Sequence, residues 1–128
     1  MKLQVQVQSD SNTFTGYGDG YIEINRVRHR GSLILAGEGP VLPWNAPSFD
    51  ALQPEHFAPV LALRPQIVLI GTGPGHRFAG AALLRPLVEH GVGFEFMDTL
   101  AACRTFNILI GEGRSVVAAL LVPKEDRT

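Results

Sequence analysis

The 128-residue sequence has one cysteine and no long apolar run. A single cysteine, Cys103, excludes an internal disulfide scaffold. No basic and then apolar leader precedes a cleavage site, so the sequence predicts a reducing, cytoplasmic location. The longest strongly apolar runs, 67–70 and 116–122, are far shorter than the roughly 20 residues that cross a bilayer. We therefore expect no direct insertion into a membrane.

An excess of charge of one sign is also missing. Eleven basic and twelve acidic residues give a net charge of −1, which excludes a whole-protein field that would attract nucleic acid. The one dense basic segment is Arg26-Val27-Arg28-His29-Arg30, whose alternation predicts three arginines on one solvated face of a strand. No aromatic residues interleave with it as a stacking platform requires, so we expect no nucleic-acid partner.

What is present is an apolar, glycine-rich and proline-rich chain of one domain, residues 1–128. Hydrophobic residues make up 45% of it, with 14 glycines and 9 prolines. This composition excludes intrinsic disorder and a coiled coil. A chain of this length buries enough surface to hold a core without metals or disulfides.

The first half of the sequence has β-strand patterns. Leu3, Val5 and Val7 alternate with glutamines, and a strand at 21–24 is predicted to pair with 32–36, giving an N-terminal β-meander layer. Pro54 suits the first turn of a helix over 54–63. Trp44 lies between Pro43 and Pro47, where it is either an exposed interaction anchor, a lid over a pocket or a core residue.

The second half alternates strands and helices. The apolar run 66–70 is typical of a parallel strand buried on both faces. A helix ending near His90, a strand at 93–97, a helix over 99–110 capped by Asp98 and a strand at 115–122 follow. This order predicts an α/β fold with a Rossmann-like βαβαβ half built on right-handed crossovers.

Polar residues follow two of the predicted strands, at the sheet edge where α/β proteins bind ligands. The glycine loop 71–77 follows one strand and Asp98 follows the next. If these strands are neighbours, the loops face each other and frame a pocket with the start of the second helix. Its candidate residues are Gly71, Thr72, Gly73, His76, Arg77, Asp98, Thr99, Cys103, Arg104 and Asn107.

No complete catalytic or cofactor motif occupies this edge. A dinucleotide-binding GxGxxG starting at Gly71 would need glycine where His76 stands, and there is no P-loop. The four histidines lack metal-ligand spacing, so we predict no metal, no cofactor and no catalytic residue. Cys103 is either a thiolate activated by the helix dipole and Arg104 or, sharing a helix face with Phe106, an inert buried thiol.

One long motif resembles a known family. It runs from Met97 to Asn107, MDTLAACRTFN, and matching residues flank it from Gly31-Ser32 to Pro123. The chain resembles the small single-domain proteins of unknown function typified by a methanogen structural-genomics protein, a family that includes the mitochondrial NADH dehydrogenase alpha-subcomplex assembly factor. The resemblance implies a three-layer α/β domain, a central mixed sheet with an antiparallel strand and an added β-layer. No catalytic residues are established for the family.

Two functional hypotheses follow. The favoured one, from the resemblance and the missing catalytic constellation, is a non-enzymatic protein-binding or assembly module similar to a respiratory complex I assembly factor, with unidentified protein partners. The alternative is a small-molecule or anion-binding protein, possibly an enzyme, with its pocket between the loop 71–75 and the start of the helix after Asp98. The oligomeric state is not predicted.

Overall fold

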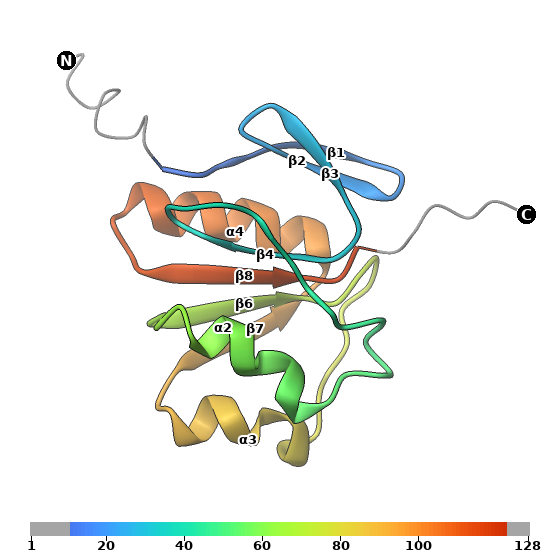
Figure 1. Cartoon of the computed structure of the whole chain (residues 1–128), viewed down its shortest axis with the longest axis vertical. Helices are drawn as coiled ribbons and strands as arrows, with labels where there is room; N and C mark the ends of the chain where they lie inside the picture. The colour runs from blue at the N-terminus through green and yellow to red at the C-terminus, as the bar shows by residue number, and fades with distance from the viewer. Residues whose placement is uncertain (1–10, 123–128) are drawn as a thin grey trace, which may run out of the picture.

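The computed structural model describes residues 11–122 (Figure 1). The predicted strand at Leu3, Val5 and Val7 lies outside the described residues. The elements, in chain order, are β1 (Phe14–Gly18), β2 (Tyr21–Ile24), β3 (Val27–Arg30), β4 (Leu33–Ala36), β5 (Leu42–Pro43), η1 (Pro54–Phe57), α2 (Ala58–Leu61), β6 (Ile67–Gly71), α3 (Ala81–Glu89), β7 (Gly93–Met97), α4 (Thr99–Gly111) and β8 (Val116–Leu120).

The central sheet is mixed and has five strands in the order β5-β4-β8-β6-β7. The strand β6 lies parallel to both β7 and β8, and β4 lies antiparallel to β8. Every residue of β8 and nearly every residue of β6 is buried, as expected for parallel strands covered on both faces. The α/β class and the βαβαβ half with its mixed sheet are thus confirmed.

Helices cover both faces of this sheet and divide the core into two clusters. On one face, α4 packs between the central sheet and the three-stranded sheet of β1, β2 and β3 (Figure 1). On the other face, η1, α2 and α3 bury Phe57, Val60 and Leu87 against the sheet. The order of layers is therefore three-stranded sheet, α4, central sheet and the group of shorter helices. The three-stranded sheet is the expected added β-layer.

The pairing predicted for β2 is wrong. It pairs antiparallel with β3, not with residues 32–36, which form β4 in the central sheet. The reason is a two-residue turn at Asn25 and Arg26, whose φ angles of 52° and 70° are those that close a tight hairpin. The three consecutive buried residues of β4 from Leu33 also require cover on both faces, which the central sheet supplies.

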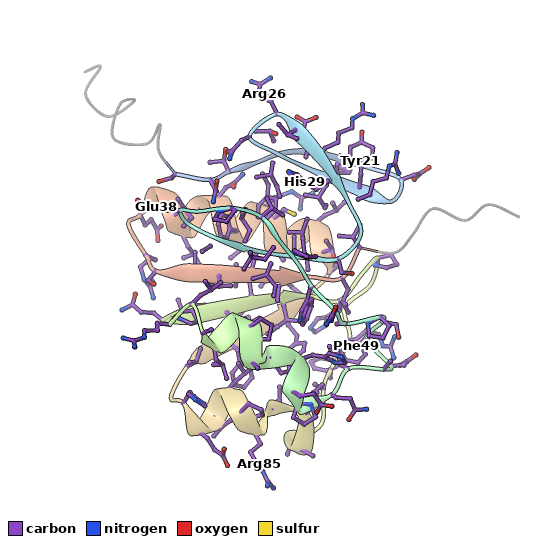
Figure 2. All side chains as sticks on the ribbon, viewed as in Figure 1. Tyr21, Arg26, His29, Glu38, Phe49 and Arg85 are labelled. Atoms are coloured by element: carbon purple, nitrogen blue, oxygen red, sulfur yellow. The ribbon has the colours of Figure 1, made fainter. Side chains whose placement is uncertain are left out.

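The basic segment differs from its predicted form as well. Arg26 lies in the hairpin turn, so only Arg28 and Arg30 share the strand face of β3. Their guanidinium carbons lie 4.5 and 5.7 Å from the centre of the Tyr21 ring. Figure 2 shows Tyr21, Arg26 and His29 at the end of the molecule formed by the three-stranded sheet. Two arginines stacked on one tyrosine therefore replace the expected row of three.

The helix boundaries follow local signals with small shifts. The predicted helix 54–63 is a 3₁₀ turn followed by the short α2, which ends at Leu61. The helix α3 begins at Ala81 and contains Pro86 in its interior, and α4 begins at Thr99 as predicted. Asp98 caps α4, since its carboxylate accepts a hydrogen bond from the Ala101 N–H at 2.9 Å.

Candidate functional site

The two predicted loops lie side by side, because β6 and β7 are parallel neighbours whose carboxyl ends meet at one edge. Backbone hydrogen bonds join them directly. The Thr72 N–H donates to the Met97 carbonyl at 2.9 Å, and the Thr99 N–H donates to the Gly73 carbonyl at 2.9 Å. The loops therefore form one bonded junction.

The Thr99 hydroxyl is the centre of this junction. Its oxygen accepts from the Gly73 N–H at 2.9 Å and donates to the Leu121 carbonyl at 2.8 Å. Thr99 is 6% exposed, so these bonds form away from water. One side chain thus ties the glycine loop, the start of α4 and the end of β8 together.

Thr72 and Asp98 are engaged in the same way. The single proton of the Thr72 hydroxyl is shared between the Gly75 and Met97 carbonyls, and the residue is 5% exposed. Asp98 holds the first turn of α4 as its cap. The polar groups at this edge therefore bond to one another, and Gly71, Thr72, Gly73 and Thr99 are all buried.

Gly71 permits the close approach of β6 to α4. A Cβ at this position would lie 2.8 Å from Leu120 Cδ2 and 3.0 Å from the backbone Cα of Thr99. Because a helix backbone cannot move aside as a side chain can, we expect Gly71→Ala to lower the unfolding free energy by about 2 kcal/mol. Gly75→Ala is the matched control, since no atom lies within 4 Å of its Cβ. Urea denaturation of both variants measures the difference, and equal stabilities would contradict this role.

The outer half of the glycine loop, taken from here on to include Phe78 directly after it, is exposed. His76 packs edge-on against Phe78 with 4.4 Å between ring centroids, and Phe78 is 83% exposed. Arg77 stacks over the Phe49 ring at 4.6 Å and forms an ion pair with Asp50. The loop therefore has a buried half that joins strands and an exposed half with an aromatic tip.

Cys103 lies on the buried face of α4 and is 8% exposed. Burial raises the pKa of its thiol to about 12; the Arg104 charge lowers the pKa and the Asp98 charge raises it further. Of the two interpretations left open by the sequence, this environment favours the buried, protonated thiol over the nucleophilic thiolate.

This shift predicts how Cys103 reacts and how stability depends on pH. We expect a thiol reagent at neutral pH to label the native protein at least about 100-fold more slowly than the urea-unfolded chain. The unfolded thiol loses its proton near its ordinary pKa of 9.0, whereas the folded thiol keeps it to about 12. The contribution of the Cys103 thiol to the free energy of unfolding is therefore complete below pH 9. Above pH 9 it declines, by up to about 1.4 kcal/mol per pH unit. The difference in unfolding free energy between wild type and Cys103→Ala, measured as a function of pH, isolates this decline. Parallel pH curves for the two proteins would contradict the raised pKa.

Two more predicted pocket residues of α4 do not join the loops. Arg104 is exposed. Asn107 reaches the three-stranded sheet instead: its Oδ1 accepts from the Phe14 N–H and its Nδ2 donates to the Phe14 carbonyl, both at 2.9 Å. Asn107 thus fastens β1 to α4. The predicted pocket set is split among the bonded junction, the core, the helix surface and this clamp.

Trp44 is a core residue and not an exposed anchor. It is 5% exposed, and its indole N–H donates to the His56 carbonyl at 2.8 Å. Its ring lies 6.2 Å from that of Phe57 between centroids. The flanking prolines are exposed, and they carry the chain across the surface while the indole points inward.

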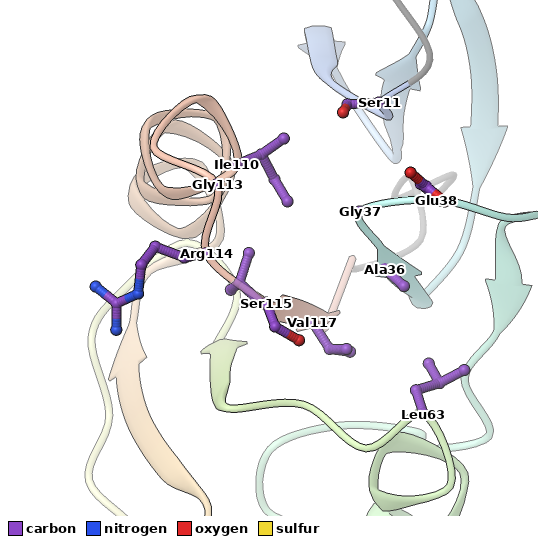
Figure 3. A pocket seen from close by; sticks show the side chains of 11 residues that line it. Ser11, Ala36, Gly37, Glu38, Leu63, Ile110, Gly113, Arg114, Ser115 and Val117 are labelled. Carbon is purple, nitrogen blue, oxygen red and sulfur yellow. The ribbon is translucent and has the colours of Figure 1, made fainter. Parts of the chain in front are cut away.

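The structure has a cavity that the sequence did not indicate. It measures about 410 Å³ and opens at the other end of the central strands, between the end of β4 and the turn that leads into β8. Ile110 and Leu63 contribute apolar walls and Glu38 lies on the rim (Figure 3). Arg114 extends away from Glu38 in this view, so the two charges do not converge. Its residues come from four distant segments, which leaves no local sequence signal.

Within residues 11–122, no group of three or more His, Cys, Asp or Glu side chains is placed to hold a metal ion. None of the helices in the same range combines the length and apolarity needed to cross a membrane.

Fold and site together define a small α/β domain in which the glycine loop and the start of α4 are joined by buried hydrogen bonds. The chain belongs to the family described as proteins of unknown function (DUF498/DUF598), whose model matches residues 14–121. This confirms the family resemblance seen in the motif around Asp98.

The chain is similar to three kinds of relative: an assembly factor, an uncharacterized bacterial protein and a protein named for the membrane. The chain is 38% identical over 85 residues to NADH dehydrogenase [ubiquinone] 1 alpha subcomplex assembly factor 3 of Bos taurus, which covers 65% of this chain. It spans 46% of that relative, about half its length. It is 39% identical to an uncharacterized protein of Rhodobacter capsulatus over 83% of this chain and 81% of the relative. A relative in Francisella tularensis, 28% identical over 94% of this chain and 99% of the relative, is named a 13 kDa major membrane protein.

Solved structures share the fold. A crystal structure of a Bordetella parapertussis protein superposes with a TM-score of 0.83 at 45% identity, covering 88% of this chain and 97% of that one. A Bordetella pertussis protein described as an Mth938-like domain gives a TM-score of 0.77 at 37% identity, covering 90% and 88%. The two-sheet architecture is therefore shared with bacterial relatives of similar size.

Proposed function

We propose that this chain is a non-enzymatic protein-binding module that takes part in the assembly of a multi-subunit complex. The observation that carries the proposal is the similarity to relatives named as assembly factors of NADH dehydrogenase. Assembly factors act by contacting other proteins, so the proposal requires a binding surface and no reaction centre.

The chemistry of the strand ends supports this proposal over the small-molecule alternative. A ligand at the predicted pocket would need the N–H groups of Gly73 and Thr99, and both already donate to protein oxygens. Rebuilding those bonds around a ligand costs the energy of leaving buried partners unpaired. The raised pKa of Cys103 likewise favours a structural thiol.

The contact region that we propose is the exposed half of the glycine loop. Phe78 is the most exposed of the large apolar side chains in the described chain, and a phenylalanine in this state loses much unfavourable hydration when a partner covers it. Arg77 is held beside it by Phe49 and Asp50. An aromatic tip next to a fixed arginine has the composition that interface centres favour.

Affinity purification from a native lysate of the source organism tests the proposal. We expect tagged wild type to enrich NADH dehydrogenase subunits or their assembly intermediates, identified by mass spectrometry. Phe78→Ser should reduce this enrichment by at least about fivefold, since a central aromatic contact is worth over 1 kcal/mol. Tyr17→Ser is the matched control because Tyr17 is 58% exposed on the distant β1.

Two results would count against the proposal. The first is the absence of any reproducible protein partner. The second is a higher melting temperature with a nucleotide, a flavin or a small anion. Binding to the native state must stabilise it, so this result would favour the small-molecule alternative.

We further propose a cytoplasmic location, on the basis of the single cysteine, and cell fractionation tests it.

A further inference from the structure

The two edges of the central sheet differ in how they are protected. At one edge, β5 has only two residues and ends in Pro43, which has no N–H to offer. At the other edge, β7 is a full strand of five residues without proline, lysine or arginine. Within the described chain no strand pairs with the outer side of β7.

The hydrogen bonds between β6 and β7 identify the backbone groups on that outer side. The Gly93 N–H donates to the Gln66 carbonyl at 3.0 Å, and the Met97 carbonyl accepts from the Thr72 N–H at 2.9 Å. In a parallel pair, alternate residues direct their groups to the same neighbour. The odd-numbered residues of β7 therefore face β6, and the N–H and C=O groups of Phe94 and Phe96 face outward.

Aromatic side chains extend from this edge along one face of the sheet. The Phe94 and Phe96 rings lie 6.2 Å apart, and Phe96 meets Phe49 edge-on at 6.3 Å between centroids. Arg77 stacks on Phe49, the last ring of this row of three. Phe94, Phe96 and Phe49 are only partly buried, so an added strand would cover apolar surface continuous with the exposed half of the glycine loop.

The opposite face of β7 carries one charge at its centre. Glu95 is exposed, pairs in register with Leu69 on the α4 side of the sheet and has no cation within ion-pair distance in the described chain. In an antiparallel added strand, the residue opposite Glu95 occupies a non-hydrogen-bonded pair, where side chains approach most closely. The charge of the residue opposite Glu95 therefore decides which added strand is favoured.

A second copy of β7 is disfavoured in its most extensive register. Two-fold pairing centred on Glu95 aligns all five residues but places Glu95 against Glu95 of the other copy, and like charges opposite each other are destabilising. Two-fold registers centred on Phe94 or Phe96 avoid this contact but shorten the overlap of the two five-residue strands. A strand with a lysine or arginine at the same position meets the charge and keeps the full length.

We propose that β7 is the docking edge for an extended segment of a partner protein, which adds as an antiparallel strand and places a basic residue opposite Glu95. Apolar residues on either side of that basic residue cover Phe94 and Phe96. The inference rests on the proposed binding function and gives its partner a definite chemistry: a basic residue within an alternating apolar strand. Main-chain bonds supply affinity and Glu95 supplies selectivity.

Two synthetic peptides test the proposal with the full chain. Both alternate valine and threonine; one has a central arginine and the other a central glutamate. We expect the arginine peptide to shift the NMR signals of the Phe94 and Phe96 amides and to slow their hydrogen exchange. We expect the glutamate peptide to bind at least about fivefold more weakly, because a cross-strand attraction becomes a repulsion. The arginine peptide with N-methylated valines should lose binding, because it lacks the donors.

Glu95→Lys is the decisive variant. Glu95 is exposed, so the substitution leaves folding nearly unchanged, and it should reverse the order of the two peptides. Equal binding of both peptides to wild type, or the same order in the variant, would overturn the role of Glu95. Protection that avoids Phe94 and Phe96 would overturn the docking edge, as would concentration-dependent dimers that pair through β7.

The inference and the proposed function can fail separately. If tagged Glu95→Lys still enriches the same subunits as wild type, and Phe78→Ser does not, the assembly role stands and the β7 edge is not its docking site. If wild type enriches no partner while the arginine peptide binds at β7, the edge is real and the assembly role fails.

Discussion

Replacing Thr99 with valine is expected to lower the free energy of unfolding by about 4 kcal/mol, the largest effect that we predict for a single polar group. Valine keeps the shape of threonine but has no hydroxyl. The Gly73 N–H loses its acceptor and the Leu121 carbonyl loses its donor. Both groups lie in a buried junction, and each unpaired buried group costs roughly 2 kcal/mol.

Thr99→Ser is the matched control because serine retains the hydroxyl and loses only a methyl group. We expect it to cost about 1 kcal/mol, the free energy of one buried carbon. Urea denaturation with a common slope gives both values. If valine and serine were equally tolerated, the junction would not depend on this hydroxyl, and its polar groups would be free for another purpose.

Replacing Asn107 with alanine is expected to cost about 3 kcal/mol. The amide of Asn107 bonds both the N–H and the carbonyl of Phe14, and its removal leaves two main-chain groups without partners beside a buried ring. Asn45→Ala is the matched control: Asn45 is exposed, so the same substitution should change stability by less than about 0.5 kcal/mol.

The loss should be confined to one part of the molecule. Asn107 lies on α4, and Phe14 begins the three-stranded sheet, where it also meets Phe106 edge-on at 5.0 Å. Relative to wild type, amide hydrogen exchange in Asn107→Ala should therefore be faster at Ile22 and Ile24 of the three-stranded sheet. At Val68 and Ile70 of the central sheet it should change much less. Uniform acceleration across both sheets would show that the clamp is not local.

Much of the second half could be predicted because its signals are local. The apolar run ending at Gly71 indicated a strand covered on both faces, and the structure confirms it. Asp98 followed by a helical pattern indicated a cap, since the capping bond spans only three residues. Once three strands alternate with two helices, the handedness of crossovers leaves few arrangements.

The candidate site was predictable only in position. The sequence located the two loops at one edge of the sheet, but it could not show that their polar groups bond to each other. That outcome depends on Thr99 meeting Gly73, which is 26 residues away in the chain. Asn107 is a sharper case, because its partner Phe14 lies 93 residues away and no spacing rule connects them.

The first half was harder because turn chemistry competed with the apolar pattern. Asparagine at position 25 is a recognisable residue for a left-handed conformation, but arginine at position 26 is an unusual one, so the sequence does not indicate the tight hairpin. The buried series of β4 does carry a signal, because three consecutive buried apolar residues are typical of a strand covered on both faces and not of the N-terminal β-meander layer.

The position of β8 has a consequence for how the chain folds during synthesis. This strand comes last in sequence among those described, yet it lies between β4 and β6 at the centre of the sheet. A nascent chain that has not yet exposed β8 to solvent outside the ribosome leaves β4 and β6 without their shared neighbour. The sheet therefore closes only after translation has passed residue 120, through contacts distant in sequence, which is typical of slow folding. Until then two apolar strand edges need protection, and chaperone dependence of the nascent chain is the expected result.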